Sequence, residues 1–406
     1  MSDLPLDIIS DILKLLPVKS LLRFRCLSKS YCSLIDSRDF IILHLSQSNN
    51  TNANRNFFIV QPNKYDCMNN EIYTVNLDYS NPHLAECDHN KINTINLDYL
   101  VGCDHPFSII PEDIWECPKT CLIFGSCNGL VALYHPQRGM FLWNLSTKRH
   151  RKLPDFWGRS QEILSSCYIL DGFGYDPVSD DYKLVRIRAI DRKRRKGSIA
   201  LVYSVKHNSS RRIEDFNYNV SRYRNCGTLV GSCLHWIVSQ PRNSSDQLIV
   251  GFNLEDEKYR EIPIPDFDDK LYKCKELGEL GGRLSMSVDE NYKSVGIWVM
   301  KEYGVRDSWI QIFSVCKANL KCVKPIGYSK TGHKLLLHVG GPKLYLLECD
   351  LQGEESQTSQ QNHISGFNQA RKVSDKRVRR INILEAGKFS RFDSTICVSS
   401  LVPVHV

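Results

Sequence analysis

The sequence predicts a small all-α segment at the N-terminus, followed by an all-β propeller that makes up most of the chain. Three observations lead to this fold class. Apolar residues recur at helical spacing up to residue 45, residues 46–56 are almost entirely polar, and short β-rich units repeat from residue 57 to residue 406. We therefore expect three parts: helices over 1–45, a polar linker over 46–56 and a β-propeller over 57–406.

The composition is that of an ordinary globular protein, with 42% hydrophobic and 24% charged residues in 406. No apolar run reaches the ~18 residues that a membrane-spanning helix needs. Asp3, Asp7 and Asp11 interrupt what would be the apolar core of a signal peptide, so we expect no secretory leader. The 16 cysteines are then expected to be reduced and mostly buried, and no paired Cys-x-x-Cys spacing predicts a metal site.

The net charge of +8 is concentrated in two short runs, 188–196 and 371–380. The rest of the chain is slightly acidic, which argues against a nucleic-acid-binding surface. The first run contains Arg192, Lys193, Arg194, Arg195 and Lys196. It is either a nuclear import signal or a solvated loop between two strands, and we expect the chain in the cytoplasm and nucleus.

The N-terminal segment carries an apolar helical face. Ile8, Ile12 and Leu16 recur at four-residue spacing, Pro17 ends this first helix, and Ser28 is placed to cap a third. About 45 residues with so much aliphatic surface are hard to stabilise alone. The segment is therefore expected to pack against the rest of the protein or against a second chain.

Residues 4–29 read LPLDIISDILKLLPVKSLLRFRCLSK, which resembles the F-box of plant proteins. Tyr31 stands where that family usually has Trp, a change that keeps a flat apolar ring. The resemblance implies binding to a Skp-family adaptor and, through it, to a cullin. The adaptor contact implied in this way consists of Leu4, Pro5, Ile8, Ile12, Leu16, Pro17 and Leu21.

Internal repeats predict the propeller. Trp143–Pro154 aligns without gaps to Phe252–Pro263, and weaker copies begin at Tyr203 and Phe313. Each is interpreted as a strand, a polar turn and a return strand, and a period of roughly fifty residues is typical of a kelch-type β-propeller. We expect six blades, with a strand near 395–402 closing the ring against the first blade near 57–60.

The repeat region also resembles the F-box-associated interaction domain of plant F-box proteins. The resemblance lies in Gly125–Leu130, Gly174–Asp176, Trp298–Val305, Ser308–Trp309 and Val398–Val402. Within the family the likeness is to the type named for constitutive expression of pathogenesis-related genes, with S-locus F-box proteins related.

The resemblance implies the substrate-recognition subunit of a Skp-cullin-F-box ubiquitin ligase, which is not itself an enzyme. The type implies intracellular immune receptors as substrates, in the regulation of plant defence. The alternative is a propeller lectin or an enzyme that carries an F-box.

No catalytic or cofactor-binding motif stands out from the sequence. Gly327–Lys334 almost spells a phosphate-binding loop, but His333 interrupts the ending and the following residues are strand-like, which favours a hairpin turn. The 12 histidines show no metal-binding spacing. We expect no catalytic residues, no metal and no cofactor.

Overall fold

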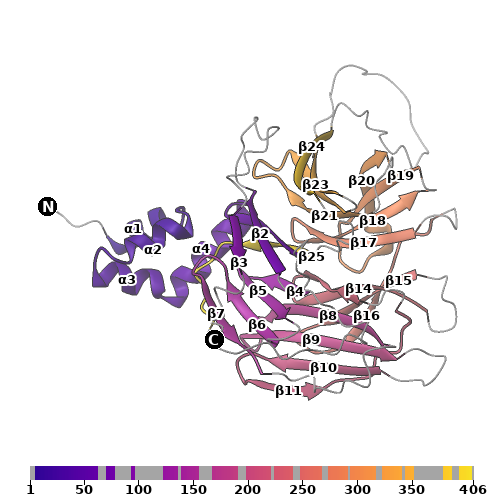
Figure 1. Cartoon of the computed structure of the whole chain (residues 1–406), viewed down its shortest axis with the longest axis horizontal. Coiled ribbons are helices and arrows are strands. Elements are labelled where there is room, and N and C mark those ends of the chain that lie inside the picture. The colour runs from indigo at the N-terminus through magenta and orange to yellow at the C-terminus, as the bar shows by residue number, and fades with distance from the viewer. Residues whose placement is uncertain are drawn as a thin grey trace.

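The computed structural model describes residues 5–62, 70–77, 93–96, 122–135, 139–154, 167–190, 198–220, 224–240, 247–267, 273–290, 293–316, 322–340, 343–351, 378–385 and 393–404. Four helices at the N-terminus stand against one side of a ring of sheets (Figure 1). They are α1 (Leu6–Leu13), α2 (Val18–Phe24), α3 (Lys29–Asp36) and α4 (Arg38–Asn50).

Local sequence sets the ends of these helices. Pro17 is the N-cap of α2, where its missing N–H is not needed. Ser28 caps α3 by accepting a 3.2 Å hydrogen bond from the Tyr31 backbone N–H, as the sequence predicts. Ser37 caps α4 in the same way through the Phe40 N–H.

The expected polar linker at 46–56 is wrong as a separate element. Helix α4 continues through Asn50, and strand β1 begins at Arg55. Ser48 is buried and accepts a 2.9 Å hydrogen bond from the Asn54 side chain. The polar composition of this stretch therefore marks a solvated helix end and a short turn rather than a flexible tether.

The described strands form six sheets, one for each blade and antiparallel except for the β8–β12 pair, which confirms the predicted number of blades. Blade 1 contains β25 (Asp393–Val398), β1 (Arg55–Pro62), β2 (Asn70–Asn76) and β3 (Asn93–Asn96); blade 2 contains β4 (Leu122–Cys127), β5 (Leu130–His135), β6 (Gly139–Asn144) and β7 (Arg149–Lys152). Blade 3 contains β8 (Cys167–Asp176), β9 (Asp181–Ile190), β10 (Ser198–Ser204), β11 (Ser209–Arg212) and, parallel to β8, β12 (Arg224–Cys226). Blade 4 contains β13 (Thr228–Val230), β14 (Cys233–Ser239), β15 (Gln247–Asn253) and β16 (Tyr259–Ile262). Blade 5 contains β17 (Lys273–Leu280), β18 (Arg283–Glu290), β19 (Ser294–Met300) and β20 (Trp309–Cys316); blade 6 contains β21 (Cys322–Tyr328), β22 (Lys334–Gly340), β23 (Lys343–Asp350) and β24 (Val378–Glu385).

The C-terminal strand closes the ring, as predicted. Strand β25 pairs with β1 so that Phe57 lies opposite Ile396. Blade 6 then packs on this sheet, because the His338 ring lies 5.5 Å from the Phe57 ring and its Nδ1 lies 3.1 Å from Ser394 Oγ. One sheet is thus assembled from the two ends of the propeller sequence.

The repeated turns have a shared geometry. The side-chain oxygen of Asn144 accepts hydrogen bonds from two backbone N–H groups of its turn, and Asn253 does the same at the aligned position. Four residues after each asparagine, Lys148 and Glu257 adopt left-handed φ values of 58° and 56°. The gapless alignment therefore reports a real structural repeat.

The copy that begins at Phe313 is wrong as a hairpin. Phe313 lies on β20, the last strand of blade 5, whereas Val323 lies on β21 of blade 6, which pairs with β22. The copies at Trp143 and Phe252 begin on the third strand of a blade, whereas Phe313 lies on the fourth. An aromatic residue followed by a polar segment occurs at both places, so this pattern does not distinguish them. The turn expected at Gly327–Lys334 is confirmed, since Tyr328 pairs with Leu335 across it.

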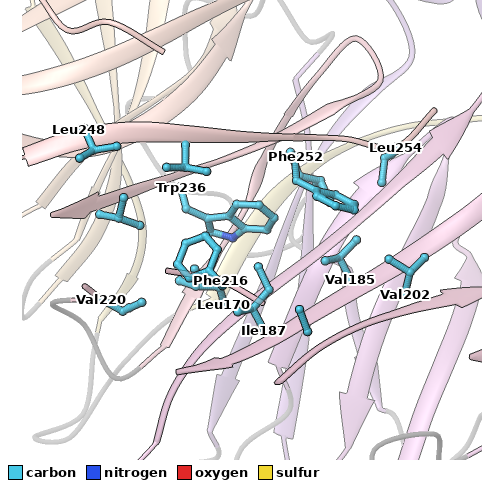
Figure 2. Close-up of a cluster of buried hydrophobic side chains, with 14 residues drawn as sticks. Leu170, Val185, Ile187, Val202, Phe216, Val220, Trp236, Leu248, Phe252 and Leu254 are labelled. Carbon is cyan, nitrogen blue, oxygen red and sulfur yellow. The ribbon is translucent and has the colours of Figure 1, made fainter. Parts of the chain in front are cut away.

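The blades are held together by apolar clusters between neighbouring sheets. In Figure 2, Trp236 and Phe252 of blade 4 face Val185, Ile187 and Val202 of blade 3. The indole N–H of Trp236 also donates a 3.1 Å hydrogen bond to the Asp171 carbonyl. Each blade therefore buries most of its apolar surface against the neighbouring blades, and the ring of blades stabilises itself.

Candidate functional site on the N-terminal helices

The outer surface of the helices is unusually apolar. Seven of the ten exposed large hydrophobic residues among those described lie between residues 6 and 43. Ile8, Ile12 and Leu15 expose 46%, 52% and 64% of their surface. Isolated exposed hydrophobics are normal, but a concentration of them marks a surface that contacts another molecule.

The spacing of residues on α1 explains this face. Ile8, Ile12 and Leu15 follow one another at i, i+4 and i+7, so they lie on one side of the helix and of the turn that continues it. Leu13 and Ile9 point the other way and enter the bundle core. Helix α1 is therefore apolar on two sides, and the bundle covers only one of them.

The structure places the seven predicted contact residues in different environments. Pro5, Ile8, Ile12 and Pro17 are exposed, and Leu4 lies outside the described residues. Leu16 is half-buried, with its carbonyl oxygen 2.9 Å from His44 Nε2.

The expectation for Leu21 is wrong. Its side chain is fully buried in the core of the bundle, together with Val18, Ile35 and Phe40. It faces inward because α2 packs its Val18 and Leu21 side against α3 and α4. Leu21 therefore supports the contact face without being part of it.

Sequence reasoning missed three exposed apolar residues, Leu6, Leu15 and Leu27, each more than 60% exposed. Leu15 could have been found by extending the Ile8 and Ile12 spacing by one more turn. Leu27 lies in the connection between α2 and α3, where no helical periodicity applies. These residues enlarge the apolar face beyond α1.

The C-terminal segment fixes the helices to the propeller. Leu401 enters the core of the helical bundle, whereas Val402 and Val404 enter the cluster between blades 2 and 3. Ile41 of α4 contacts both clusters. Because side chains alternate along an extended chain, one short segment binds two domains at once.

Polar contacts hold this segment in place. The Asn144 amide donates to the carbonyl oxygens of Ser400 and Val402 at 3.1 and 2.7 Å. Ser400 Oγ donates to the Asn128 carbonyl at 2.7 Å. On the surface, Arg38 of α4 forms a 2.8 Å ion pair with Asp180 of blade 3. The orientation of the contact face relative to the propeller is therefore defined.

His44 stabilises the bundle from inside. It is fully buried, stacks on Phe40 and lies beside the Leu16 carbonyl. Burial lowers its pKa below 6.5, against the opposing effect of that hydrogen bond. The neutral ring is thus the form that the native bundle holds.

A polar pocket of about 260 Å³ lies between blades 3 and 4. Lys183 is buried there between Asp176 Oδ2 at 2.8 Å and Glu257 Oε1 at 2.9 Å. Burial alone lowers the pKa of Lys183, but the two carboxylates outweigh it and raise the pKa. These charges satisfy one another, so the pocket serves mainly to join two blades.

Other expected features bear less on the site. Residues 192–196 lie outside the described residues. Within the described parts of the chain, no group of His, Cys, Asp and Glu side chains could hold a metal ion. No described helix is long and apolar enough to cross a membrane.

Comparison with known proteins agrees with this architecture. Residues 1–43 match the F-box domain, and residues 106–369 match the F-box associated beta propeller domain. The chain is thus a helical F-box joined to a propeller, and it belongs to the family of F-box proteins with an F-box associated propeller domain.

Two relatives from Arabidopsis thaliana illustrate the relationship. F-box protein CPR1 is 30% identical over 86% of this chain and 83% of its own length. F-box/kelch-repeat protein At3g23880 is 27% identical over 77% of this chain and 79% of its own. Apo prolyl oligopeptidase B from Galerina marginata aligns over 88% of this chain and 58% of its own with a TM-score of 0.37 and 10% identity, too distant to bear on function.

Proposed function

We propose that this protein is the substrate-recognition subunit of a Skp-cullin-F-box ubiquitin ligase. The observation that carries the proposal is the exposed apolar face formed by Leu6, Ile8, Ile12 and Leu15 on an F-box that is packed against a propeller. The Skp-family adaptor covers that face, the cullin binds through the adaptor, and the propeller captures the protein to be modified.

The contribution of this chain to the reaction is proximity. Holding a partner beside the charged ubiquitin carrier raises the effective concentration of its lysines. A fixed junction between helices and propeller strengthens this effect, because a flexible tether would spread the partner over a larger volume. The bond-forming chemistry belongs to other subunits.

Reconstitution tests the proposal. The full chain is combined with a Skp-family adaptor, a cullin with its RING subunit and a charged ubiquitin carrier, and ubiquitin transfer is measured on proteins captured from proteasome-inhibited cells. The variant Ile8→Asp/Ile12→Asp is expected to capture the same proteins but to support no transfer. Absence of adaptor binding by the unaltered chain would refute the proposal. Capture of a glycan or turnover of a small molecule would favour the propeller lectin or enzyme instead.

Two finer points extend the proposal. The similarity to CPR1 supports a role in plant defence, with intracellular immune receptors as captured proteins; these should accumulate in cells that lack this chain.

Residues Arg192, Lys193, Arg194, Arg195 and Lys196 would direct part of the protein to the nucleus. Replacing them by Ser and Gly in a fluorescent fusion should abolish nuclear signal, and an unchanged distribution would exclude the import role.

A further inference from the structure

The outer strand of blade 2 is entirely basic. Strand β7 and the turn before it contain Lys148, Arg149, His150, Arg151 and Lys152. All are exposed except Arg151, which is half-buried. Within the described residues no carboxylate forms an ion pair with any of them, whereas Arg211, Arg212 and Arg260 on the equivalent strands of blades 3 and 4 each pair with an acid.

No described strand pairs with the outer edge of this strand. β7 is the last strand of its sheet and, among the described strands, pairs only with β6, with Asn144 opposite Arg149 and Phe141 opposite Lys152. Its other edge therefore presents backbone N–H and C=O groups to which an extended peptide can add as a further strand. Charge and backbone together make this edge a surface for an extended, negatively charged chain.

Both faces of the edge carry positive charge. Arg151 lies opposite Leu142, which packs toward blade 3, and His150 lies opposite Trp143, which packs toward blade 1. Because side chains alternate along a strand, Arg149 shares the face of Arg151, and Lys152 shares the face of His150. An added strand with acids at every second position would meet Arg149 and Arg151 on one face, or Lys152 beside the His150 ring on the other.

The repeat supplies an internal comparison. Aligned with Lys148, His150 and Lys152 of blade 2 are Glu257, Tyr259 and Glu261 of blade 4. The outer strand of blade 4 therefore has balanced charge at the same position in the fold, and its Glu257 pairs with Lys183 and Arg211. Charged residues commonly protect sheet edges from aggregation, but the blade 4 strand does so with both signs. The uniform charge of β7 is thus not required by its place in a blade.

We propose that the β7 edge binds an extended acidic segment of the captured protein by strand addition. This rests on the proposed function and names the chemistry that the receptor recognises. The turn between β6 and β7 begins at Asn144, which also holds the C-terminal segment against the helices. A segment bound on β7 therefore lies on the side of the propeller that carries the F-box, as the position of β7 near α4 shows (Figure 1).

The test uses the full chain and a fluorescein-labelled peptide of alternating Glu and Val, measured by anisotropy. Lys148→Glu/Lys152→Glu should bind the peptide at least about tenfold more weakly than the unaltered chain, because two attractive charges become repulsive. The matched control Lys258→Glu/Arg260→Glu changes net charge equally on the outer strand of blade 4 and should bind within about twofold of wild type. A peptide with Pro at alternate positions should lose binding, since it cannot donate to the strand edge.

Several outcomes would overturn the proposal. Equal peptide binding by the unaltered chain and the β7 variant would show that β7 is not the binding site. An equal loss of binding in the blade 4 control would show the same. Tighter binding of oligouridine of equal charge would indicate a nucleic-acid surface instead. Adaptor binding is measured on the same proteins. If the β7 variant loses peptide binding but neither the unaltered chain nor any variant binds the adaptor, only the proposed function is refuted. If all of them bind the adaptor and the β7 variant binds the peptide as well as the unaltered chain does, only this inference is refuted.

Discussion

The helices and the propeller differ in how many of their large apolar side chains are exposed. Within the described residues, the propeller exposes only Val178, Tyr303 and Val305 among its large hydrophobics, whereas the much shorter helical segment exposes seven such residues. The apolar faces of each blade are buried against the neighbouring blades, so the ring needs no further partner to cover them. The helical bundle has one face covered by the propeller and another that no described part of the chain covers. The difference separates a self-sufficient domain from one that is completed by a partner.

The covered face of the bundle depends on the far end of the chain. Leu401 lies in the bundle core, and Val402 and Val404 are buried in the propeller. We expect Leu401→Ala to lower the free energy of unfolding by about 2–5 kcal/mol, the usual cost of removing a buried leucine side chain. Chemical unfolding measures this, with hydrogen exchange in α2 and α3 as a local probe.

Pro403→Ala is the matched control, because Pro403 is exposed between those buried residues. It should change stability by less than about 0.5 kcal/mol. Similar losses in both variants, or unchanged exchange in α2 and α3, would mean that the segment does not hold the helices.

A second prediction concerns the site where this segment meets blade 2. Gly129 has a φ of +82°, and a Cβ added there would lie too close to Ser400 Oγ, at 2.1 Å. Gly129→Ala should therefore destabilise the protein by about 2 kcal/mol or more, from backbone strain and displacement of Ser400. Gly231 has a φ of +58° and no atom within 4 Å of an added Cβ, so Gly231→Ala should show only the strain, about 1 kcal/mol. Equal effects in thermal unfolding would argue against close packing at Ser400.

The third prediction compares one buried histidine in each region. Burial lowers the pKa of His44 in the helices, and it lowers that of His235, which contacts Tyr303 and the Thr228 carbonyl, to about 4. In the unfolded chain these imidazoles bind a proton more readily than in the folded protein. The stability that the neutral histidines give the fold is therefore complete above the unfolded pKa of 6.5 and is lost as the pH falls below it. His235 should contribute a slope of up to about 1.4 kcal/mol per pH unit between its folded and unfolded pKa values, and His44 a slope of the same sign.

Urea unfolding between pH 7 and 5 measures these slopes. His44→Gln and His235→Gln should each flatten the dependence, whereas His150→Gln, at an exposed residue, should leave it unchanged. A slope that is the same in all four proteins would exclude these histidines as its source.

Local sequence patterns predict much of the fold. Features that depend on contacts between distant parts of the chain could not be predicted in this way. Helical spacing from Ile8 to Leu16 predicted the helical segment, the aligned turns at Asn144 and Asn253 predicted the blades, and the apolar run at 395–402 predicted the closing strand. Leu21 could not be assigned correctly, because whether a residue on a short helix faces inward depends on helices packed later. The role of Leu401 in the bundle is even less accessible, since some 380 residues separate it from its neighbour Leu21.

Adaptor binding is the most direct test of the uncovered face. Calorimetric titration of the Skp-family adaptor compares the unaltered chain with Ile8→Ser/Ile12→Ser and with Val178→Ser, an exposed apolar change on the propeller. Losing two apolar anchors, each worth about 1.5–3 kcal/mol, should weaken binding by about a hundredfold or more and reduce the negative heat-capacity change. Adaptor affinity of Val178→Ser, and the unfolding temperatures of both variants, should match those of the unaltered chain. Adaptor affinity within about twofold for Ile8→Ser/Ile12→Ser would contradict the account.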